Sequence, residues 1–101
     1  MNIEQYLLTK LAEEASEISQ IALKAQQFGM SEVMAGQPLT NAERIYAELN
    51  DLVAILEMLD CNSPFRFVPS SEAIAQKKSK VLKYAKYTHE LGILDSPCIS
   101  V

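Results

Sequence analysis

The sequence predicts an all-α protein, a helical bundle of three main helices per chain that is completed by oligomerisation. Three observations support this fold class. Apolar residues recur every three or four positions in three separate stretches. Glycines and prolines separate those stretches. At 101 residues and 49% hydrophobic content, the chain is long enough for one small core but has little surplus stability, so another subunit is expected to complete the bundle.

The first predicted helix carries its apolar residues from Ile3 to Phe28, and Gly29 supplies a C-terminal stop. Residues 29–39 contain two glycines and a proline, so they are predicted to form a loop. A loop of this length suggests a function beyond connecting two helices.

The second predicted helix begins with a capping box. Thr40 is followed three positions later by Glu43, and in this pattern each side chain satisfies a free backbone N–H of the other residue. The helix then runs to about Asp60. Residues 61–69 contain two prolines, which keep this connector from being helical.

The third predicted helix is capped by Ser70 or Ser71 and ends near Leu91 and Gly92. The apolar residues that follow are too few for another helix, but they are able to pack against a neighbouring surface. We therefore expect one domain over residues 1–92 and a C-terminal tail over residues 93–101.

Composition excludes several classes of function. A net charge of −4 argues against a protein that binds nucleic-acid polymers, because such binding depends on clustered lysines and arginines. Cys61 and Cys98 have no metal-binding spacing and do not form a disulfide framework. No segment approaches the roughly 18 apolar residues of a membrane span, and no signal peptide is evident. We expect a cytoplasmic protein without a membrane partner.

Two of the predicted helices carry the same pattern of acidic residues. In the first, Glu14 falls inside the apolar stripe and Glu17 lies at its border, roughly 60° away around the helix. In the second, Glu48 lies within the stripe and Asp51 is again displaced by roughly 60° to its border. If the two helices pack through these stripes, four carboxylates converge.

Converging carboxylates need a compensating charge. A buried carboxylate loses its hydration at a cost of several kcal/mol unless it is paired, and two carboxylates ~5 Å apart repel by about 3 kcal/mol at an effective dielectric of about 20. Oxygen ligands favour a hard cation, Mg²⁺ or its substitute Mn²⁺, and the only histidine, His89, is remote in sequence. The predicted metal ligands are Glu14, Glu17, Glu48 and Asp51.

A second interpretation of the same residues stays open. Acidic residues three positions apart occur on many solvent-exposed helices, where they pair with side chains such as Lys10, Lys24 or Arg44. The chain would then be a non-catalytic helical interaction module. Thermal unfolding with and without Mg²⁺ or Mn²⁺ separates the two interpretations, because a ligand that binds only the folded state raises its stability.

At EEASE (residues 13–17) and ELND (residues 48–51) the chain resembles the MazG-like all-α nucleoside triphosphate pyrophosphohydrolases. The signature of that superfamily is Glu-x-x-Glu, an interval, then Glu-x-x-Asp. The likeness extends to the Phe28-Gly29 pair after a lysine-bearing helix and to AELNDLVAILEML at residues 47–59. It covers roughly residues 5–90.

The resemblance implies an enzyme, assembled as a homodimer or homotetramer, that controls the nucleotide pool. It would cleave a nucleoside triphosphate between the α and β phosphates to give a nucleoside monophosphate and pyrophosphate. The residues that match the superfamily's Mg²⁺ ligands are Glu14, Glu17, Glu48 and Asp51. Lys77 and Lys80 match a basic motif on the next helix, but Val81 stands where some members have Asn, so contacts to the sugar or base are not carried over.

In the implied mechanism the ion held by these acids would lower the pKa of a water that attacks phosphorus, and Glu14 and Glu17 are the expected proton acceptors. Cationic side chains stabilise the phosphates and the leaving pyrophosphate. The candidates for this role are Lys24, Arg44, Lys77, Lys78 and Lys80. A purine nucleotide such as dGTP is the expected substrate, because the loop over residues 29–39 and two tyrosines are able to enclose a large base. Phosphoribosyl-ATP, the substrate of a pyrophosphatase with a similar acidic arrangement, is the alternative.

Overall fold

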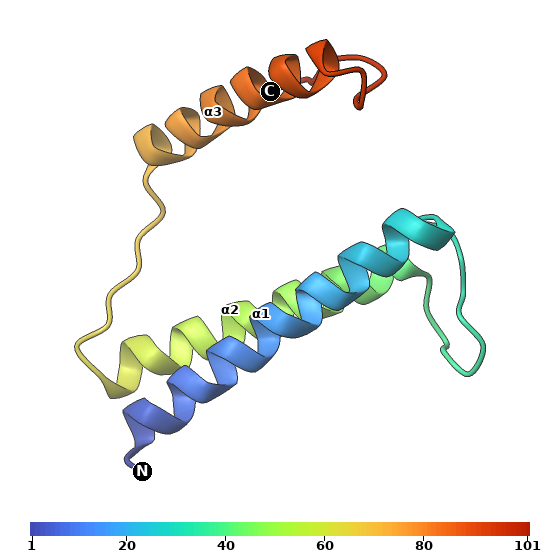
Figure 1. The fold of residues 1–101 in the computed structure, drawn as a ribbon. Coiled ribbons are helices and arrows are strands. Elements are labelled where there is room, and N and C mark those ends of the chain that lie inside the picture. The colour runs from blue at the N-terminus through green and yellow to red at the C-terminus, as the bar shows by residue number, and fades with distance from the viewer. The chain divides into compact units, whose positions relative to one another are not determined.

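The structure is a computed structural model that describes residues 1–101, and it consists of three α-helices with no strands (Figure 1). The helices are α1 (Ile3–Phe28), α2 (Asn41–Asn62) and α3 (Ser71–Glu90). The predicted all-α class with three main helices is confirmed. The chain divides into two compact units, Met1–Phe67 and Val68–Val101, and each is described by itself.

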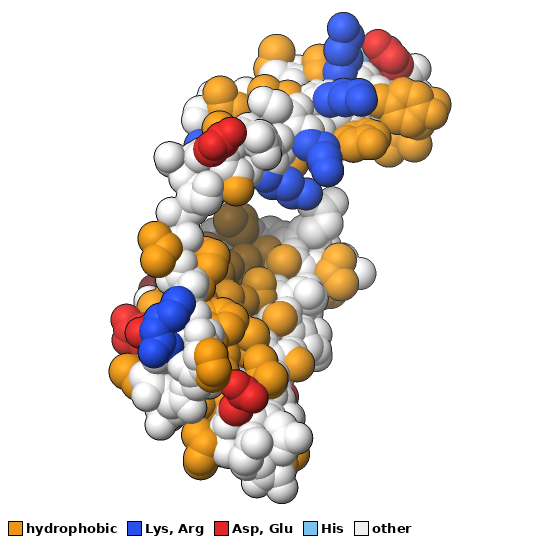
Figure 2. Space-filling view, turned by 90° about the vertical axis from the view of Figure 1, so that its left-hand side faces the viewer, with side chains coloured by type: hydrophobic (Ala, Val, Ile, Leu, Met, Phe, Trp, Pro, Cys, Tyr) orange, Lys and Arg blue, Asp and Glu red, His pale blue; other side chains and the backbone are white.

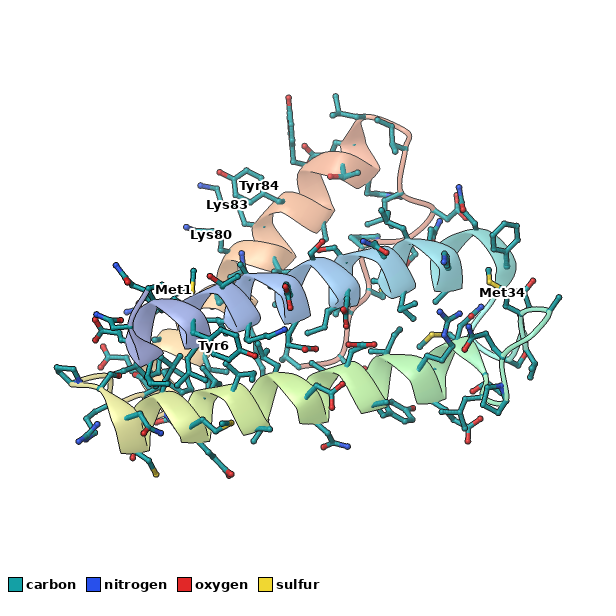
Figure 3. All side chains as sticks on the ribbon, turned by 90° about the horizontal axis from the view of Figure 1, so that it is seen from below. Met1, Tyr6, Met34, Lys80, Lys83 and Tyr84 are labelled. Atoms are coloured by element: carbon teal, nitrogen blue, oxygen red, sulfur yellow. The ribbon has the colours of Figure 1, made fainter.

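The first unit is a helical hairpin in which α1 and α2 pack against each other side by side along their length (Figures 1 and 3). Met1 and Tyr6 lie at one end of this hairpin and Met34, in the connecting loop, lies at the other (Figure 3). The apolar stripes of both helices supply the buried side chains. These are Leu7, Ile21 and Ala25 from α1 and Leu59 from α2.

Both ends of α1 are fixed by local hydrogen bonds. The Asn2 side chain accepts from the Gln5 N–H at 2.8 Å, and the Gln5 side chain accepts from the Asn2 N–H at 2.9 Å. This capping box satisfies two backbone donors that the first helical turn leaves free. At the other end Gly29 adopts a φ of 98°, which favours glycine, and α1 ends at Phe28 as predicted.

The predicted capping box of α2 is confirmed. The Glu43 N–H donates to the Thr40 hydroxyl oxygen at 3.1 Å, and the Thr40 N–H donates to the Glu43 carboxylate at 3.0 Å. The helix continues to Asn62, slightly beyond the predicted end at about Asp60. There the Ser63 hydroxyl donates to the carbonyl of Leu59 at 2.7 Å and ends the helix.

The second unit contains α3 and the C-terminal tail. Ser70 is the N-cap, since its hydroxyl oxygen accepts from the Ala73 N–H at 3.1 Å. The helix ends at Glu90, and Gly92 turns the chain with a φ of 78°. The tail then returns along the helix, where the Val101 carbonyl oxygen accepts from Lys78 Nζ at 3.2 Å.

The two units differ in the side chains that they expose. Apolar side chains gather on the hairpin, whereas the lysines of α3 give the second unit a basic surface (Figure 2). Exposed apolar residues also occur on α3, where Val81 is 43% exposed and Tyr84 is 57% exposed. None of the three helices is both long enough and apolar enough to cross a membrane.

Candidate acidic site and its cavity

Three of the four predicted acidic residues meet between α1 and α2. Glu14, Glu17 and Glu48 each place one carboxylate oxygen within 4.8 Å of the other two. Glu14 and Glu17 lie about one turn apart on α1, so both reach the helix that packs beside them. The convergence therefore comes from the packing of two apolar stripes, each of which contains a glutamate.

Two of the three carboxylates are partly removed from water. Glu14 Oε2 and Glu48 Oε2 are both buried and have no hydrogen-bond partner, whereas the Glu17 side chain is exposed. A buried polar oxygen without a partner costs free energy. The site thus has two oxygens that need a proton or a cation and one acid that opens to solvent.

The proximity of the three acids changes the ionisation of Glu48. A hydrogen bond to Glu17 that only the protonated carboxyl group of Glu48 is able to donate, followed by burial and the negative charges of Glu17 and Glu14, raises the pKa of Glu48 from 4.5 to about 7. Each cause disfavours the charged carboxylate. Near neutral pH both the protonated and the charged form of this carboxyl group are therefore populated, and a cation placed among the three acids would take over the role of that proton.

Asp51, the fourth predicted ligand, is not part of this cluster. Its side chain is exposed on α2, three residues beyond Glu48. The pattern of the sequence placed it at the border of the apolar stripe, and the exposed position agrees with that placement. The structure therefore brings together Glu14, Glu17 and Glu48 but leaves Asp51 outside their contact distance.

A cavity of about 460 Å³ lies next to the cluster. This volume is within the range of small-molecule sites. Glu17 and Glu48 contribute to its wall, together with Lys24 from α1 and Arg44 from α2. The other lining residues are Gln20, Ile21, Gln37, Leu39 and Ala47. The predicted cationic residues Lys24 and Arg44 are thus brought beside the acids.

The two cations of the cavity are half-buried and form no ion pair within the hairpin unit. The polar contact of Arg44 is with the sulfur of Met34, at 4.0 Å from Nη1. The nearby surface lysine Lys10 differs, because it pairs with Glu13 at 3.1 Å. Lys24 and Arg44 therefore keep their positive charges available to an anion in the cavity.

The loop between α1 and α2 forms another wall of the cavity through Gln37 and Leu39. Asn41 holds this loop in place and is fully buried. Its Nδ2 donates to the Gly29 carbonyl at 2.9 Å and to the Glu32 carboxylate at 3.2 Å, and its backbone N–H donates to the Glu32 carbonyl at 2.9 Å. Asn41 is not among the residues predicted from the sequence, because its place directly after the capping residue of α2 does not indicate burial.

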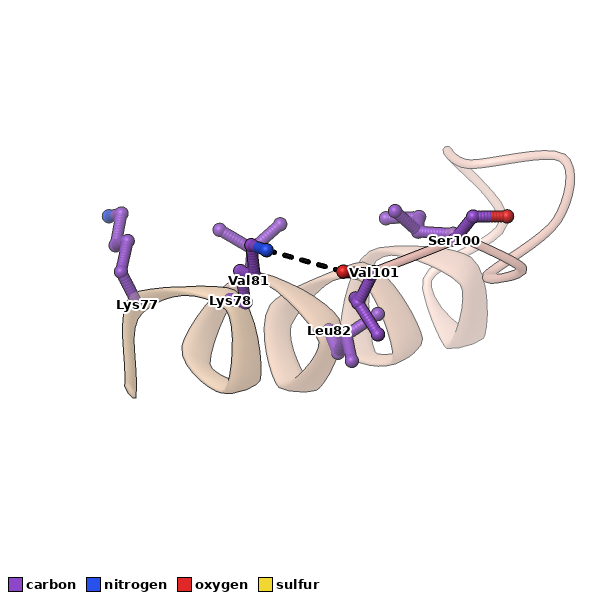
Figure 4. Close-up of a pocket in the computed structure, with 7 residues that line it drawn as sticks. Lys77, Lys78, Val81, Leu82, Ser100 and Val101 are labelled. Atoms are coloured by element: carbon purple, nitrogen blue, oxygen red, sulfur yellow. Dashed lines mark hydrogen bonds between the residues drawn. The ribbon is translucent and has the colours of Figure 1, made fainter. Parts of the chain in front are cut away.

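The remaining predicted substrate-binding residues lie in the second unit. Lys77 and Lys78 line a hollow of about 240 Å³ with the tail residues Ser100 and Val101 (Figure 4). Lys77 and Lys80 line a second hollow on α3, of about 430 Å³. Lys80, Lys83 and Tyr84 project from one side of the helix (Figure 3). These lysines share one helix, whereas Lys24 and Arg44 share a cavity with the acids.

Comparison with protein-family models, curated proteins and solved structures found no match. The resemblance to the MazG-like pyrophosphohydrolases therefore stays a prediction from the two acidic motifs.

Proposed function

We propose that the protein is a Mg²⁺-dependent nucleoside triphosphate pyrophosphohydrolase. It would convert a ribo- or deoxyribonucleoside triphosphate to the monophosphate and pyrophosphate, and so control the nucleotide pool of the cytoplasm. One observation supports this proposal most. Three glutamates from two helices converge beside a cavity that also contains Lys24 and Arg44. Such a site offers ligands for a metal and partners for phosphate in one place.

The donor set suits a hard divalent cation. All three ligand atoms are carboxylate oxygens, and no histidine or cysteine belongs to the cluster, so Mg²⁺ is favoured and Mn²⁺ is a possible substitute. The unpaired buried oxygens of Glu14 and Glu48 would be satisfied by the ion. Asp51 is proposed as a fourth ligand, because it lies about one turn beyond Glu48 on α2.

The other roles follow from exposure and charge. When bound, the ion supplies charge neutralisation at the phosphates and lowers the pKa of a coordinated water. Glu17 is exposed on the cavity wall and is the better placed proton acceptor, with Glu14 as the second candidate. Lys24 and Arg44 would donate charge-assisted hydrogen bonds to phosphate oxygens.

The α3 lysines and the oligomer belong to the same proposal. Large apolar side chains are exposed on all three helices, including Leu23 at 66%, Val53 at 50% and Ile74 at 47%. Exposed apolar surface of this extent marks interaction sites, and we propose a homodimer or homotetramer.

Lys77, Lys78 and Lys80 would bind substrate phosphates in that assembly. A purine such as dGTP is the proposed base, because Tyr84 and Tyr87 are exposed and able to stack on it.

The test is a turnover panel in which pyrophosphate release is measured with Mg²⁺ and with Mn²⁺. The panel contains all common nucleoside and deoxynucleoside di- and triphosphates and phosphoribosyl-ATP. We expect metal-dependent release from at least one purine triphosphate, and loss of release in Glu48→Gln and Asp51→Asn. Glu13→Gln is the matched control, since Glu13 is exposed and pairs with Lys10 outside the cluster. Unchanged turnover in both site variants would remove the proposed mechanism.

A further inference from the structure

Positive charge is distributed unequally on the two sides of the acidic cluster. On the side that faces the loop, Lys24 lies seven residues beyond Glu17 along α1, or roughly 10 Å along the helix axis. Arg44 lies four residues before Glu48 on α2, or roughly 6 Å. Both cations line the cavity. The loop-facing end of the cavity is therefore the cationic end.

The opposite side of the cluster is acidic. From Glu48 to its end at Asn62, α2 contains no lysine or arginine, and Asp51 adds a negative charge there. On α1, the nearest lysine in this direction is Lys10, which is paired with Glu13. An anion with several charges would be repelled on this side and attracted on the other.

Two further features of the loop-facing end suit phosphate groups. Gln20 and Gln37 line it and carry side-chain amides, which are hydrogen-bond donors to phosphate oxygens. The loop that contributes Gln37 is held by the buried Asn41. The wall is thus fixed by hydrogen bonds within the chain itself, which lowers the entropic cost of binding.

We propose that the loop-facing end of the cavity binds the pyrophosphate leaving group through Lys24 and Arg44, an assignment that rests on the proposed pyrophosphohydrolase activity. The α phosphate then lies at the acidic cluster, and the nucleoside lies on the side away from the loop. This orientation differs from the expectation that the loop encloses the nucleobase. The loop then lies beside the pyrophosphate portion of the substrate, so it distinguishes nucleotides by the number of their phosphates.

The reaction is balanced in this orientation. The oxygen of water forms a bond to the α phosphorus, and the bond between that phosphorus and the oxygen bridging to the β phosphate breaks. The electron pair of the broken bond leaves with pyrophosphate, and the water proton passes to a carboxylate of the cluster. Lys24 and Arg44 neutralise the negative charge that grows on the leaving group.

Isothermal titration calorimetry on the full chain tests the assignment. Inorganic pyrophosphate and dGMP are titrated separately, each with Mg²⁺, into the wild type and into Lys24→Met and Arg44→Met. We expect pyrophosphate affinity to fall about tenfold or more in each variant, as the loss of a charge-assisted contact predicts, and dGMP affinity to change less than about twofold. Arg44→Lys keeps the charge but loses the planar guanidinium, so its pyrophosphate affinity should lie between those of the wild type and Arg44→Met.

Controls separate this assignment from folding and from the proposed activity. Lys10→Met removes a lysine outside the cavity and should leave both affinities unchanged, and thermal unfolding reports whether each variant is folded. Three outcomes would each overturn the assignment: equal losses of dGMP and pyrophosphate affinity, no effect of either variant on pyrophosphate affinity, or no binding of pyrophosphate by the wild type.

The experiment also separates this assignment from the proposed activity. If nucleotides are hydrolysed but the variants bind pyrophosphate normally, only this assignment fails. If no nucleotide is hydrolysed but pyrophosphate binding depends on Lys24 and Arg44, the anion site stands and the activity fails.

Discussion

The helical hairpin and the unit that contains α3 both carry clusters of like charge, but they hold them differently. In the hairpin, acids from two helices are brought within 4.8 Å of each other by packing around buried residues such as Leu7 and Leu59. In the second unit, the lysines are neighbours because they follow one another along a single helix. That unit buries only Ala85.

This difference distinguishes a candidate cation site, in the hairpin, from a solvated charged surface, on α3. Charges along one helix repel weakly in water and spread apart, so they need no partner to compensate them. Charges that two packed helices force together lose hydration as well, as the buried oxygens of Glu14 and Glu48 do. The hairpin therefore creates a requirement for a proton or a cation, and α3 does not.

The largest effect should come from breaking the packing that brings the acids together. Leu59→Ala removes the most buried apolar side chain of the hairpin, which is 0% exposed, and should lower the free energy of unfolding by about 2–5 kcal/mol. Leu91→Ala, at a position 56% exposed after α3, should cost less than about 1 kcal/mol. Urea denaturation measures both. Equal costs would show that the two units do not differ in packing.

The loop wall of the cavity is the next target. Asn41→Ala removes the donors to the Gly29 carbonyl and the Glu32 carboxylate, and should cost about 1–3 kcal/mol because two hydrogen bonds of a buried side chain are lost. Limited proteolysis should cut residues 29–40 faster in this variant. Asn50→Ala, at an exposed position of α2, is the control, and the protease should cleave it at the same rate as the wild type. An unchanged cleavage rate in Asn41→Ala would show that this side chain does not hold the loop.

The pH dependence of the hairpin follows from Glu48. Its pKa in the folded chain, about 7, lies above its ordinary value of 4.5, so between these two pH values the folded state holds a proton that the unfolded state has released. The stabilising contribution is fully present below pH 4.5 and is lost as the pH rises through about 7. In the absence of metal, the free energy of unfolding should therefore decline over this interval, and Glu48→Gln should abolish that decline.

Added Mg²⁺ should oppose this decline of the free energy of unfolding with rising pH. The ion needs the deprotonated carboxylate, so its affinity should rise by up to about tenfold per pH unit below pH 7 and level off above it. Denaturation at pH 5, 6, 7 and 8 with and without Mg²⁺ measures both effects. A Mg²⁺ effect that does not vary with pH would contradict the assignment of Glu48 to the site.

The smallest expected change in the free energy of unfolding comes from substitutions at the helix caps of the two units. Thr40→Ala breaks a reciprocal capping box and should lower the free energy of unfolding by about 1 kcal/mol. Ser70→Ala removes a single cap hydrogen bond and should cost about 0.5 kcal/mol. Denaturant titration of the two variants tests the ranking. A larger cost at Ser70 would show that α3 contributes more to stability than its exposed surface indicates.

The helices could be predicted from the sequence because their signals are local. The Thr40 and Glu43 pair fixed the start of α2, and Gly29 fixed the end of α1. The box formed by Asn2 and Gln5 was missed although it has the same spacing, with an amide in place of each hydroxyl and carboxylate. The end of α2 was placed early, because the hydroxyl of Ser63 ends the helix after Asn62 and the prolines lie farther on.

The candidate site could be predicted only in part. A helical wheel gives the direction of each acid around its own helix, and this placed Glu14 and Glu48 inside facing stripes and Glu17 and Asp51 at their borders. It does not show which border residue comes close to the acids of the facing helix, so the inclusion of Glu17 and the exclusion of Asp51 had to come from the packed helices. The burial of Asn41 was hidden from the sequence for the same reason, because it depends on how residues 29–40 fold over the start of α2.

The central claim is that packing of α1 against α2 creates a site for a divalent cation. Titration calorimetry with Mn²⁺ tests it most directly, on the wild type, Glu14→Gln, Glu48→Gln and the control Glu13→Gln. The wild type and Glu13→Gln should bind the ion alike, and each of the two site variants should bind it at least tenfold more weakly, as the loss of one ligand charge predicts. Equal affinity in all four proteins, or no binding by the wild type at millimolar Mn²⁺, would contradict the claim.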